Sequence, residues 1–201
     1  MATVDTDGAV LLRTGFAVLG KILSGTGQVL FTKAELDKGY LPSDTDVEDL
    51  TAPCSYAGAA TIAKCENTGT GEATVTVQAS SIGVEQGFFI TGVMLYVQDP
   101  VTKADVPYSY LALQKNPEWM RPENSSVGKL VTFSIVNIVS SATNVVAVIS
   151  PDALARSEDL EALYSMVVNG YLTFLLADSD GSILCTDDYE LLVADGKLVF
   201  A

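Results

Sequence analysis

The sequence contains no histidine in its 201 residues. Without imidazole, the Ser-His-Asp and Cys-His forms of nucleophile activation are excluded, and so is every metal site that uses a histidine ligand. Carboxylate pairs and a perturbed lysine stay open as catalytic groups, but no motif in the chain points to either of them. We therefore predict that the chain is not an enzyme and binds no cofactor.

Cysteine and basic residues are also scarce. Cys54, Cys65 and Cys185 are an odd number of thiols, and their spacings match no zinc pattern. A Cys54–Cys65 disulfide is conceivable, whereas synthesis in a reducing cytosol favours free, partly buried thiols. Eleven Lys and Arg stand against 25 Asp and Glu, which gives a net charge of −14. Because a nucleic-acid surface needs a basic stripe, we expect no nucleic-acid binding.

No targeting or membrane-spanning segment is apparent. The N-terminus has no basic region followed by an apolar run, so no signal peptide is expected. The most apolar stretch, residues 129–150, is interrupted by Ser, Thr and Asn. A membrane helix needs about 20 predominantly apolar residues. The β-branched content of this stretch predicts instead a pair of strands at 129–139 and 143–149, and we expect no membrane insertion.

In a stretch near the middle of the chain, residues 86–100, the second half is apolar on both faces. Val93, Leu95 and Val97 alternate with Met94 and Tyr96. A strand that is apolar on both faces is buried on both sides, so we predict that it lies centrally in a sheet. Hydrophobic residues make up 48% of the chain and charged residues only 18%, which is typical of a folded domain.

The segments around this strand predict a mainly β domain with one short helix. The helix is expected from Thr14, as N-cap, to Ser24, with Phe16, Leu19 and Leu23 on its buried face and Gly25 at its end. Short strands are expected at 29–32, at 72–79 with one wet face, and at 106–113 as the hairpin partner of the central strand. Residues 33–53 are predicted to form an acidic loop with a helical turn.

The pattern of expected secondary structure changes after residue 150, from long strands to a helix and short hairpins. Ser157 is a candidate N-cap for a helix that ends at Asn169-Gly170, and Asp180-Gly181 and Asp195-Gly196 are hairpin signals. We predict two parts, 1–150 and 151–201. The fold class expected is α+β, mainly β: an antiparallel sheet or sandwich core with a short N-terminal helix, then a helix and C-terminal β-hairpins.

Two ligand motifs are incomplete. The run from Gly15 to Lys21 is one residue short of a phosphate-binding loop, and Ile22 stands where a hydroxyl residue would bind Mg²⁺. The acidic residues Asp44 and Asp46 lack the glycine and the closing glutamate of a calcium loop, and Asp178, Asp180 and Asp187 do not fit that template either. Solvated loops and hairpin turns account for both acidic groups.

Several short motifs occur in an order that resembles a known family. They are a Thr14 helix ending at Gly25, Phe31-Thr32-Lys33, Gly39, Leu50-Thr51, residues 88–100 with their terminal Asp-Pro, an aromatic-proline loop at 116–126, and Ala142-Thr143-Asn144-Val145. Together they span roughly residues 10–150. This region resembles the N-terminal domain of the phage tail-collar fibre proteins. The match is loose at residues 37–39, where that family has two glycines flanking one residue.

The resemblance implies a structural role in a bacteriophage, a prophage or a phage-tail-like particle. The chain is then expected to be a tail-fibre or baseplate protein that attaches a fibre to the tail. It would be made in the bacterial cytoplasm, reside in the virion tail and form a homo-oligomer, with a trimer favoured because tail fibres are threefold. Other tail or baseplate proteins are the expected partners. Only some fifty residues follow the resembling region, where the family has a long shaft and tip.

A second hypothesis is a module that binds a carbohydrate or a receptor, such as a host cell-surface glycan. Tyr108, Tyr110, Trp119 and Tyr171 are candidates for stacking on sugar rings. Trp119, the only tryptophan, is open to two interpretations: an exposed contact residue, or a loop anchor packed on the sheet.

Overall fold

The computed structural model describes residues 8–25, 27–69, 71–140, 142, 144–150, 153, 193–194 and 197–198. The chain divides into two units, residues 1–154 and 155–201, and each is considered by itself. In the second unit, β11 (Val193–Ala194) and β12 (Lys197–Leu198) pair antiparallel, as the turn signal between them predicts. The predicted helix after Ser157 and the hairpin at 180–181 lie outside the described residues.

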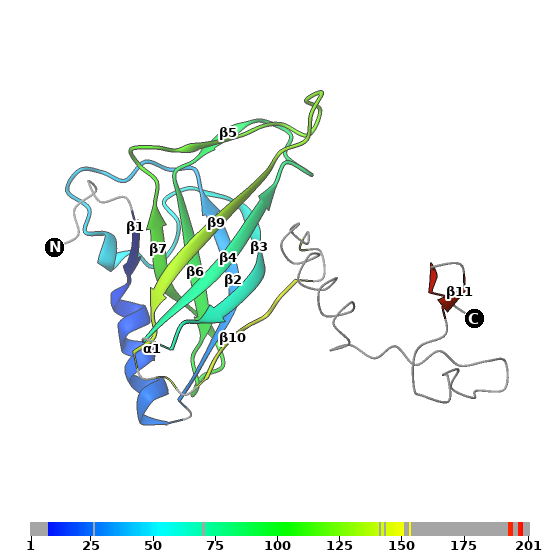
Figure 1. The fold of residues 1–201 in the computed structure, drawn as a ribbon. Helices are drawn as coiled ribbons and strands as arrows, with labels where there is room; N and C mark the ends of the chain where they lie inside the picture. Colours follow the sequence, from blue (N-terminus) through cyan, green and yellow to red (C-terminus); the bar gives the residue numbers. More distant parts are fainter. Residues whose placement is uncertain are drawn as a thin grey trace. The chain divides into compact units, whose positions relative to one another are not determined.

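The first unit is mainly β, as predicted, and is built on one curled sheet (Figure 1). In spatial order its strands are β1 (Gly8–Leu11), β7 (Asp105–Ala112), β6 (Gly92–Gln98), β2 (Gln28–Asp37), β3 (Tyr56–Asn67), β4 (Glu72–Ser80) and β9 (Leu130–Ile138). Neighbours in this order are antiparallel, whereas β10 (Asn144–Ala147) pairs with β2 in parallel. The remaining elements are α1 (Arg13–Ser24), the 3₁₀ turn η1 (Val47–Asp49), β5 (Phe88–Ile90) and β8 (Glu118–Met120).

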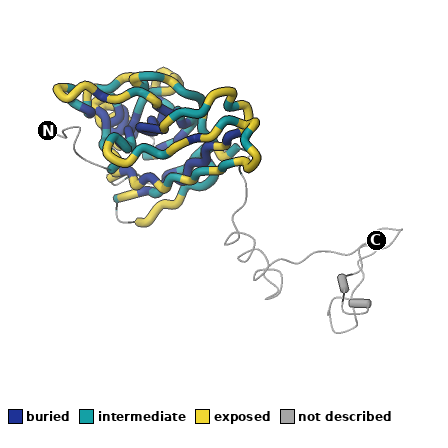
Figure 2. Tube along the Cα trace, turned by 90° about the horizontal axis from the view of Figure 1, so that it is seen from above, coloured by how far each residue is buried: buried dark blue, intermediate teal, exposed yellow. Residues whose placement is uncertain are grey.

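Strand β6 lies inside the sheet and is buried on both faces, which confirms the prediction for residues 93–97, whereas residues 88–90 of the same stretch form β5 in a separate two-stranded sheet. One face enters a large apolar group, the interior cluster, whose members on β6 are Val93, Leu95 and Val97. The other face enters a smaller group, the outer cluster, made of Leu12, Leu41, Val47, Met94, Tyr96, Tyr110 and Ala112. Figure 2 shows the buried positions gathered within the first unit. The predicted hairpin of β6 and β7 is also confirmed.

Helix α1 packs its apolar face into the interior cluster but differs from the prediction in two respects. It begins at Arg13 with Leu12 as N-cap, and Thr14 instead donates a hydrogen bond to the Pro107 carbonyl. Its buried face comprises Gly15, Val18, Leu19 and Ile22, whereas Phe16 and Leu23, which were expected beside Leu19, are 70% and 39% exposed. The cause is a close approach to β7: a Cβ on Gly15 would lie 2.2 Å from the Tyr108 carbonyl oxygen. The predicted end of the helix at Gly25 is confirmed.

Three strand predictions need correction. β2 continues to Asp37, beyond the predicted 29–32, because it is paired on both sides. β3 was not predicted at all, since its alanines and glycine carry little strand propensity. The predicted wet face of β4 is largely dry, because β4 lies between β3 and β9 and its Thr76 and Gln78 are buried.

The apolar stretch after residue 129 forms two strands, as predicted, but they do not pair with each other. β9 pairs with β4, and β10 pairs with the first residues of β2. At this point β3 has diverged from β2, since their ladder covers only residues 34–37 of β2. β10 therefore fills the wedge between them, and the Ser150 N–H donates to the Ile62 carbonyl of β3.

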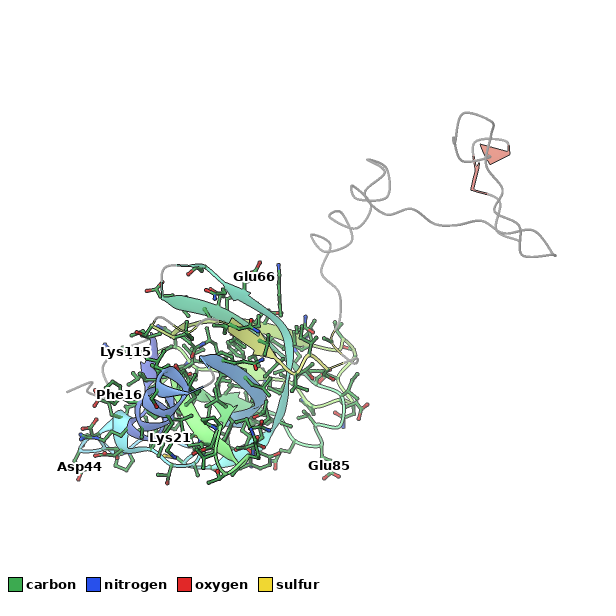
Figure 3. The ribbon with its side chains drawn as sticks, turned by 90° about the horizontal axis from the view of Figure 1, so that it is seen from below. Phe16, Lys21, Asp44, Glu66, Glu85 and Lys115 are labelled. Atoms are coloured by element: carbon green, nitrogen blue, oxygen red, sulfur yellow. The ribbon has the colours of Figure 1, made fainter. Side chains whose placement is uncertain are left out.

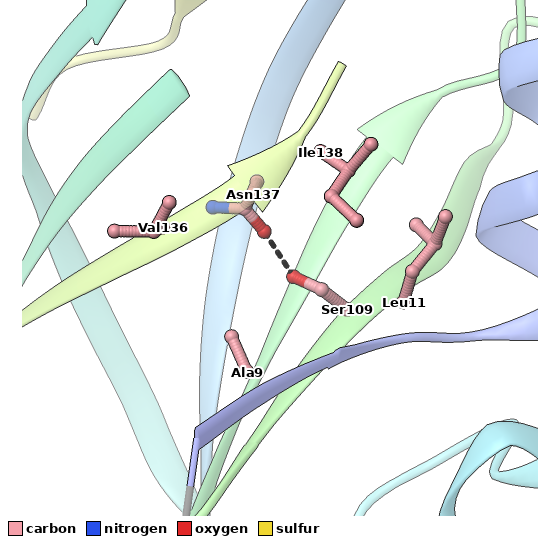
Figure 4. A pocket seen from close by; sticks show the side chains of 6 residues that line it. All are labelled: Ala9, Leu11, Ser109, Val136, Asn137 and Ile138. Atoms are coloured by element: carbon pink, nitrogen blue, oxygen red, sulfur yellow. Dashed lines mark hydrogen bonds between the residues drawn. The ribbon is translucent and has the colours of Figure 1, made fainter. Parts of the chain in front are cut away.

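The sheet curls until its first and last strands approach each other (Figure 4). No backbone ladder joins β1 to β9 among the described residues. Side chains of β7, the neighbour of β1, reach β9 instead. The Ser109 hydroxyl donates to the Asn137 side-chain oxygen at 2.5 Å, and the Tyr108 hydroxyl donates to the Ile138 carbonyl. A small pocket lies here, lined by Ala9, Leu11, Ser109, Val136, Asn137 and Ile138. Side-chain hydrogen bonds thus close the curled sheet.

Candidate interaction surface

A two-stranded ribbon, β5 paired with β8, lies at one end of the curled sheet (Figure 1). Alternation along its strands gives the ribbon two different faces. Ile90 and Met120 are completely buried in the interior cluster. Phe89 and Trp119 are direct cross-strand partners, and 46% and 41% of their surfaces remain exposed. The ribbon thus anchors itself by one face and presents two aromatic rings on the other.

The two aromatic rings are held in place by their surroundings. Their centroids are 4.8 Å apart with the ring planes at 59°. Gly87 lets the indole lie against the backbone, because a Cβ there would be 2.5 Å from the Trp119 ring. The Lys129 ammonium donates to the Trp119 carbonyl and to the Glu118 carboxylate, both at 2.5 Å. The aromatic pair is therefore supported by contacts within the chain itself.

Exposed aliphatic residues lie close to the ribbon. Ile82, two residues after the end of β4, is 78% exposed. Val127, three residues before β9, and Leu130, the first residue of β9, are also exposed. Lys129 connects them to the ribbon, since its backbone hydrogen bonds with Ser81 and its ammonium contacts Trp119. We call Ile82, Phe89, Trp119, Val127 and Leu130 the ribbon surface. Clustered exposed apolar residues of this kind mark interaction sites more often than scattered ones do.

The charge around the ribbon surface differs from that of the whole chain. Segments 82–90 and 115–130 carry three basic residues (Lys115, Arg121, Lys129) and three acidic ones (Glu85, Glu118, Glu123). The full chain has 11 basic and 25 acidic residues. An open depression beside the ribbon is lined by Val84, Glu85, Glu123 and Asn124. The surface is thus locally balanced in an otherwise acidic protein.

A second polar site, at Asp37, is internal. This fully buried carboxylate accepts hydrogen bonds from the Gly39, Cys54 and Ser55 N–H groups and from the Tyr110 hydroxyl. Burial and the charge of Asp37 raise the pKa of Tyr110. Each of the two carboxylate oxygens accepts two hydrogen bonds from the chain itself. Asp37 therefore stabilises the loop between β2 and β3.

A third polar group lies on the outward side of β2 and β6. The Tyr96 hydroxyl and the Lys33 ammonium both donate to Glu35, at 2.6 and 2.8 Å. Lys33 also lies 4.1 Å from the centre of the Tyr96 ring. Burial raises the pKa of Tyr96, and its hydrogen bond to Glu35 adds to that shift. Burial raises the pKa of Glu35 as well, but the hydrogen bonds from Lys33 and Tyr96 outweigh it and leave that pKa lowered. Glu35, Lys33 and Tyr96 therefore supply one another's hydrogen-bond partners on the outward side of the two strands.

The aromatic residues suggested for sugar stacking differ in their exposure to solvent. Tyr108 and Tyr110 are fully buried, which removes them from any surface. Trp119 combines the two interpretations given for it: it packs against Phe89 and is still exposed, and it lies on a strand rather than in a loop. Tyr171 lies outside the described residues. Phe89 was missed, because only the register of β5 against β8 brings it to Trp119.

The incomplete ligand motifs have structural roles. Gly15 and Lys21 lie in helix α1, and Lys21 binds the Asp99 carboxylate at 2.6 Å. Asp46 caps η1 and pairs with Arg13. No group of three or more Cys, Asp or Glu converges as a metal site within the described part of the chain. Asp178, Asp180 and Asp187 lie outside it.

The thiols at Cys54 and Cys65 are free; Cys65 is partly buried, as predicted, whereas Cys54 is exposed. Cys185 lies outside the described residues. Burial raises the pKa of both described thiols. Neither is therefore activated as a nucleophile.

Comparison with protein-family models, with curated proteins and with solved structures finds no match to this chain. Of the helices in the described residues, none has the length and apolar character needed to cross a membrane.

Proposed function

We propose that this chain is a structural protein of a bacteriophage tail, or of a prophage or phage-tail-like particle, in which it attaches a fibre to the tail or baseplate. On this proposal it acts by shape and contact, is not an enzyme and forms a homo-oligomer, with a trimer favoured. It is made in the bacterial cytoplasm and resides in the virion tail. The ordered motifs between residues 10 and 150 supply the particular class of particle.

The observation that carries the proposal is the preorganised ribbon surface on a rigid scaffold. Trp119 and Phe89 are fixed by packing and by Lys129, yet both remain partly in water. Exposed apolar surface costs a free protein about 25 cal/mol per Å² relative to its burial. A partner that covers these rings recovers that free energy without first ordering them. Such a surface suits a protein whose task is assembly.

A second candidate function is binding of a host cell-surface glycan. It is favoured by one observation: an open depression lined by Val84, Glu85, Glu123 and Asn124 is formed by the segments that flank the ribbon, which carries the exposed Trp119. An aromatic ring can stack on a sugar while carboxylates and an amide accept and donate to its hydroxyls. The burial of Tyr108 and Tyr110 leaves this candidate fewer aromatic residues than the sequence suggested.

The proposed function is tested by finding the chain in particles. Tail-bearing particles are purified from the source culture on a density gradient, and their proteins are identified by mass spectrometry. Immunogold electron microscopy with an antibody to the chain then locates it. We expect the chain in the particle fraction and gold at the tail. Its absence from purified particles, with the chain present only in the soluble lysate, would contradict the proposal.

A further inference from the structure

We infer that the ribbon surface is where this chain contacts a second copy of itself, with Trp119 and Phe89 at the centre of the contact. The inference rests on the proposed function, which requires an assembling protein, and it names the surface that assembles. Three features of the described residues support a self-contact at this place: composition, charge and order.

The composition of the ribbon surface is that of an interface centre. Besides its two aromatic residues it contains the exposed Ile82, Val127 and Leu130, and Arg121 directly follows β8. Tryptophan and arginine are enriched among the residues that dominate binding energy, and aromatic residues are enriched in interface cores. Met120, one residue from Trp119, is completely buried beneath it. The rings therefore rest on a firm layer.

The charge balance favours a second copy as the occupant. A chain with a net charge of −14 repels its own copies over most of its surface. The two segments that carry the ribbon surface hold three basic and three acidic residues, and Lys129 and Glu118 already neutralise each other within the chain, so two copies meet here without opposing a net charge. A contact made by an acidic protein with itself is least opposed where its own charge is balanced.

The order of the ribbon reduces what association costs. Lys129 contacts both Glu118 and the Trp119 carbonyl, and Gly87 seats the indole against the backbone. Binding sites lose affinity when loops and side chains must be ordered on contact, typically about 0.5–1.5 kcal/mol for each immobilised side chain. In this ribbon the Trp119 indole already packs against Phe89 and Gly87 within the monomer, which lowers that cost.

Phe16 provides a contrasting surface. It is 70% exposed and lines an open pocket with Leu11, Leu12, Arg13 and Glu48. The adjacent loop carries Asp44, Asp46, Glu48 and Asp49, and Arg13 is the base that pairs with two of them. In Figure 3, Phe16 and Asp44 lie on one side of the first unit and Glu85 on the opposite side. Two copies meeting at Phe16 would oppose acidic loops, so Phe16 is a matched control.

The test uses the tryptophan itself. Trp119 is the only tryptophan in the chain, so its fluorescence reports directly on the ribbon surface. The full chain is diluted from about 100 µM to below 1 µM while emission wavelength and acrylamide quenching are recorded, and sedimentation velocity gives the mass at each end. We expect an oligomer at high concentration, with blue-shifted and protected Trp119 emission that reverts on dilution.

Two variants localise the contact. Phe89→Ala keeps the fluorescent reporter and removes its neighbour, and we expect it to raise the dissociation constant at least about tenfold. Phe16→Ala removes an equally large exposed ring elsewhere and should leave the dissociation constant unchanged. Trp119→Ala, followed by sedimentation alone, should be monomeric at about 100 µM. Circular dichroism melting curves establish that each variant is folded, and Trp119→Phe should restore association in part.

The outcomes separate this inference from the proposed function. A wild-type chain that remains monomeric at about 100 µM overturns the self-contact, as does an oligomer that is indifferent to Phe89→Ala and Trp119→Ala. A monomer whose Trp119 emission shifts on addition of soluble host oligosaccharide overturns it in favour of the glycan candidate. If the chain is found in tail particles while any of these results holds, the proposed function stands and the self-contact fails. If the self-contact is verified but particles lack the chain, the reverse applies.

Discussion

The interior and outer clusters lie on opposite faces of the same strand and are closed in different ways. The interior cluster is enclosed by the curled sheet, by helix α1 and by the ribbon, and its members are almost entirely hydrocarbon. The outer cluster is covered by the loop between β2 and β3, which has only the short turn η1 as regular structure. Regular elements satisfy their own backbone groups, whereas a covering loop needs side chains to do so.

Side-chain hydrogen bonds perform this task in the outer cluster. Asp37 binds both ends of the loop, through Gly39 at one end and Cys54 and Ser55 at the other. The Thr91 hydroxyl donates to the Gly39 carbonyl, and the Leu41 N–H donates to Gln114. The comparison teaches that apolar burial suffices where strands and helices enclose a core, and that a buried polar anchor is needed where a loop does.

The largest effect is expected from removing that anchor. Asp37→Ala leaves the Tyr110 hydroxyl and three backbone N–H groups without their acceptor. Removing one partner from a buried charged network costs about 3–5 kcal/mol, and the free energy of unfolding should fall by about that amount. Urea unfolding measures the change, and hydrogen exchange should show lost protection in residues 38–55. Asp49→Ala, an exposed carboxylate of the same loop, should cost under about 1 kcal/mol. Equal losses for both would refute the anchor.

The two faces of β6 offer the next comparison. Leu95→Ala opens a cavity in the interior cluster, which rigid strands cannot fill, and should cost about 3–4 kcal/mol. Met94→Ala, one residue away, opens a cavity beneath the loop, which can settle, and should cost about 2 kcal/mol. Urea unfolding of both variants measures the difference. A Met94 variant less stable than the Leu95 variant would show that the loop is as rigid as the sheet.

The hydrogen bond between Ser109 of β7 and Asn137 of β9 is a buried polar contact beside the otherwise apolar interior cluster. Ser109→Ala removes the partner of the buried Asn137 oxygen and should lower the free energy of unfolding by about 1–2 kcal/mol. Hydrogen exchange should locate the effect in the last residues of β9. Thr14→Val, which removes a hydrogen bond of α1 to β7, serves as the control and should leave β9 protected. Unchanged exchange in β9 after Ser109→Ala would mean that packing alone closes the sheet.

The smallest effect concerns the ion pair that ties α1 to the β6–β7 turn. The hydrogen bond from Lys21, with those from the Val101 and Thr102 N–H groups, lowers the pKa of Asp99 to about 2 from an ordinary value of 3.8. A carboxyl that ionises more readily in the folded state stabilises it above about pH 4, and this contribution is lost as the pH falls towards 2. Asp99→Asn should therefore weaken the fall in urea midpoint between pH 5 and pH 2.5. An unaltered pH profile would refute the role of Asp99.

The parts of the fold that sequence predicts are those set by local pattern. Alternation along residues 93–97 predicts a strand buried on both faces, and Gly25 predicts the end of α1. β3 cannot be predicted from local pattern, because its residues favour no secondary structure strongly. It is a strand because it pairs with β2 and β4. β10 follows β9 in sequence, so a hairpin is expected. Only the wedge between β2 and β3, a long-range feature, shows why β10 pairs elsewhere.

The candidate surface was predictable in the same limited sense. Trp119 stands out because it is the only tryptophan and lies between two prolines. The sequence fits both an exposed contact residue and a loop anchor at this position. Its partner Phe89 belongs to a different apolar run, and no sequence pattern pairs residues thirty positions apart. The face of α1 was misassigned for a related reason, since the contact of Gly15 with Tyr108 decides which residues turn inward.

The wedge that β10 fills has a consequence for how the protein is made. β2 is synthesised early, but its first residues gain their parallel neighbour only after residue 147 has emerged. Parallel pairings of such high sequence separation form late and slowly, because a long loop must be closed before the contact stabilises anything. Until then, Gln28 to Phe31 present an open ladder that a neighbouring nascent chain can occupy. Expression of this protein should accordingly be sensitive to translation speed and crowding on the polysome.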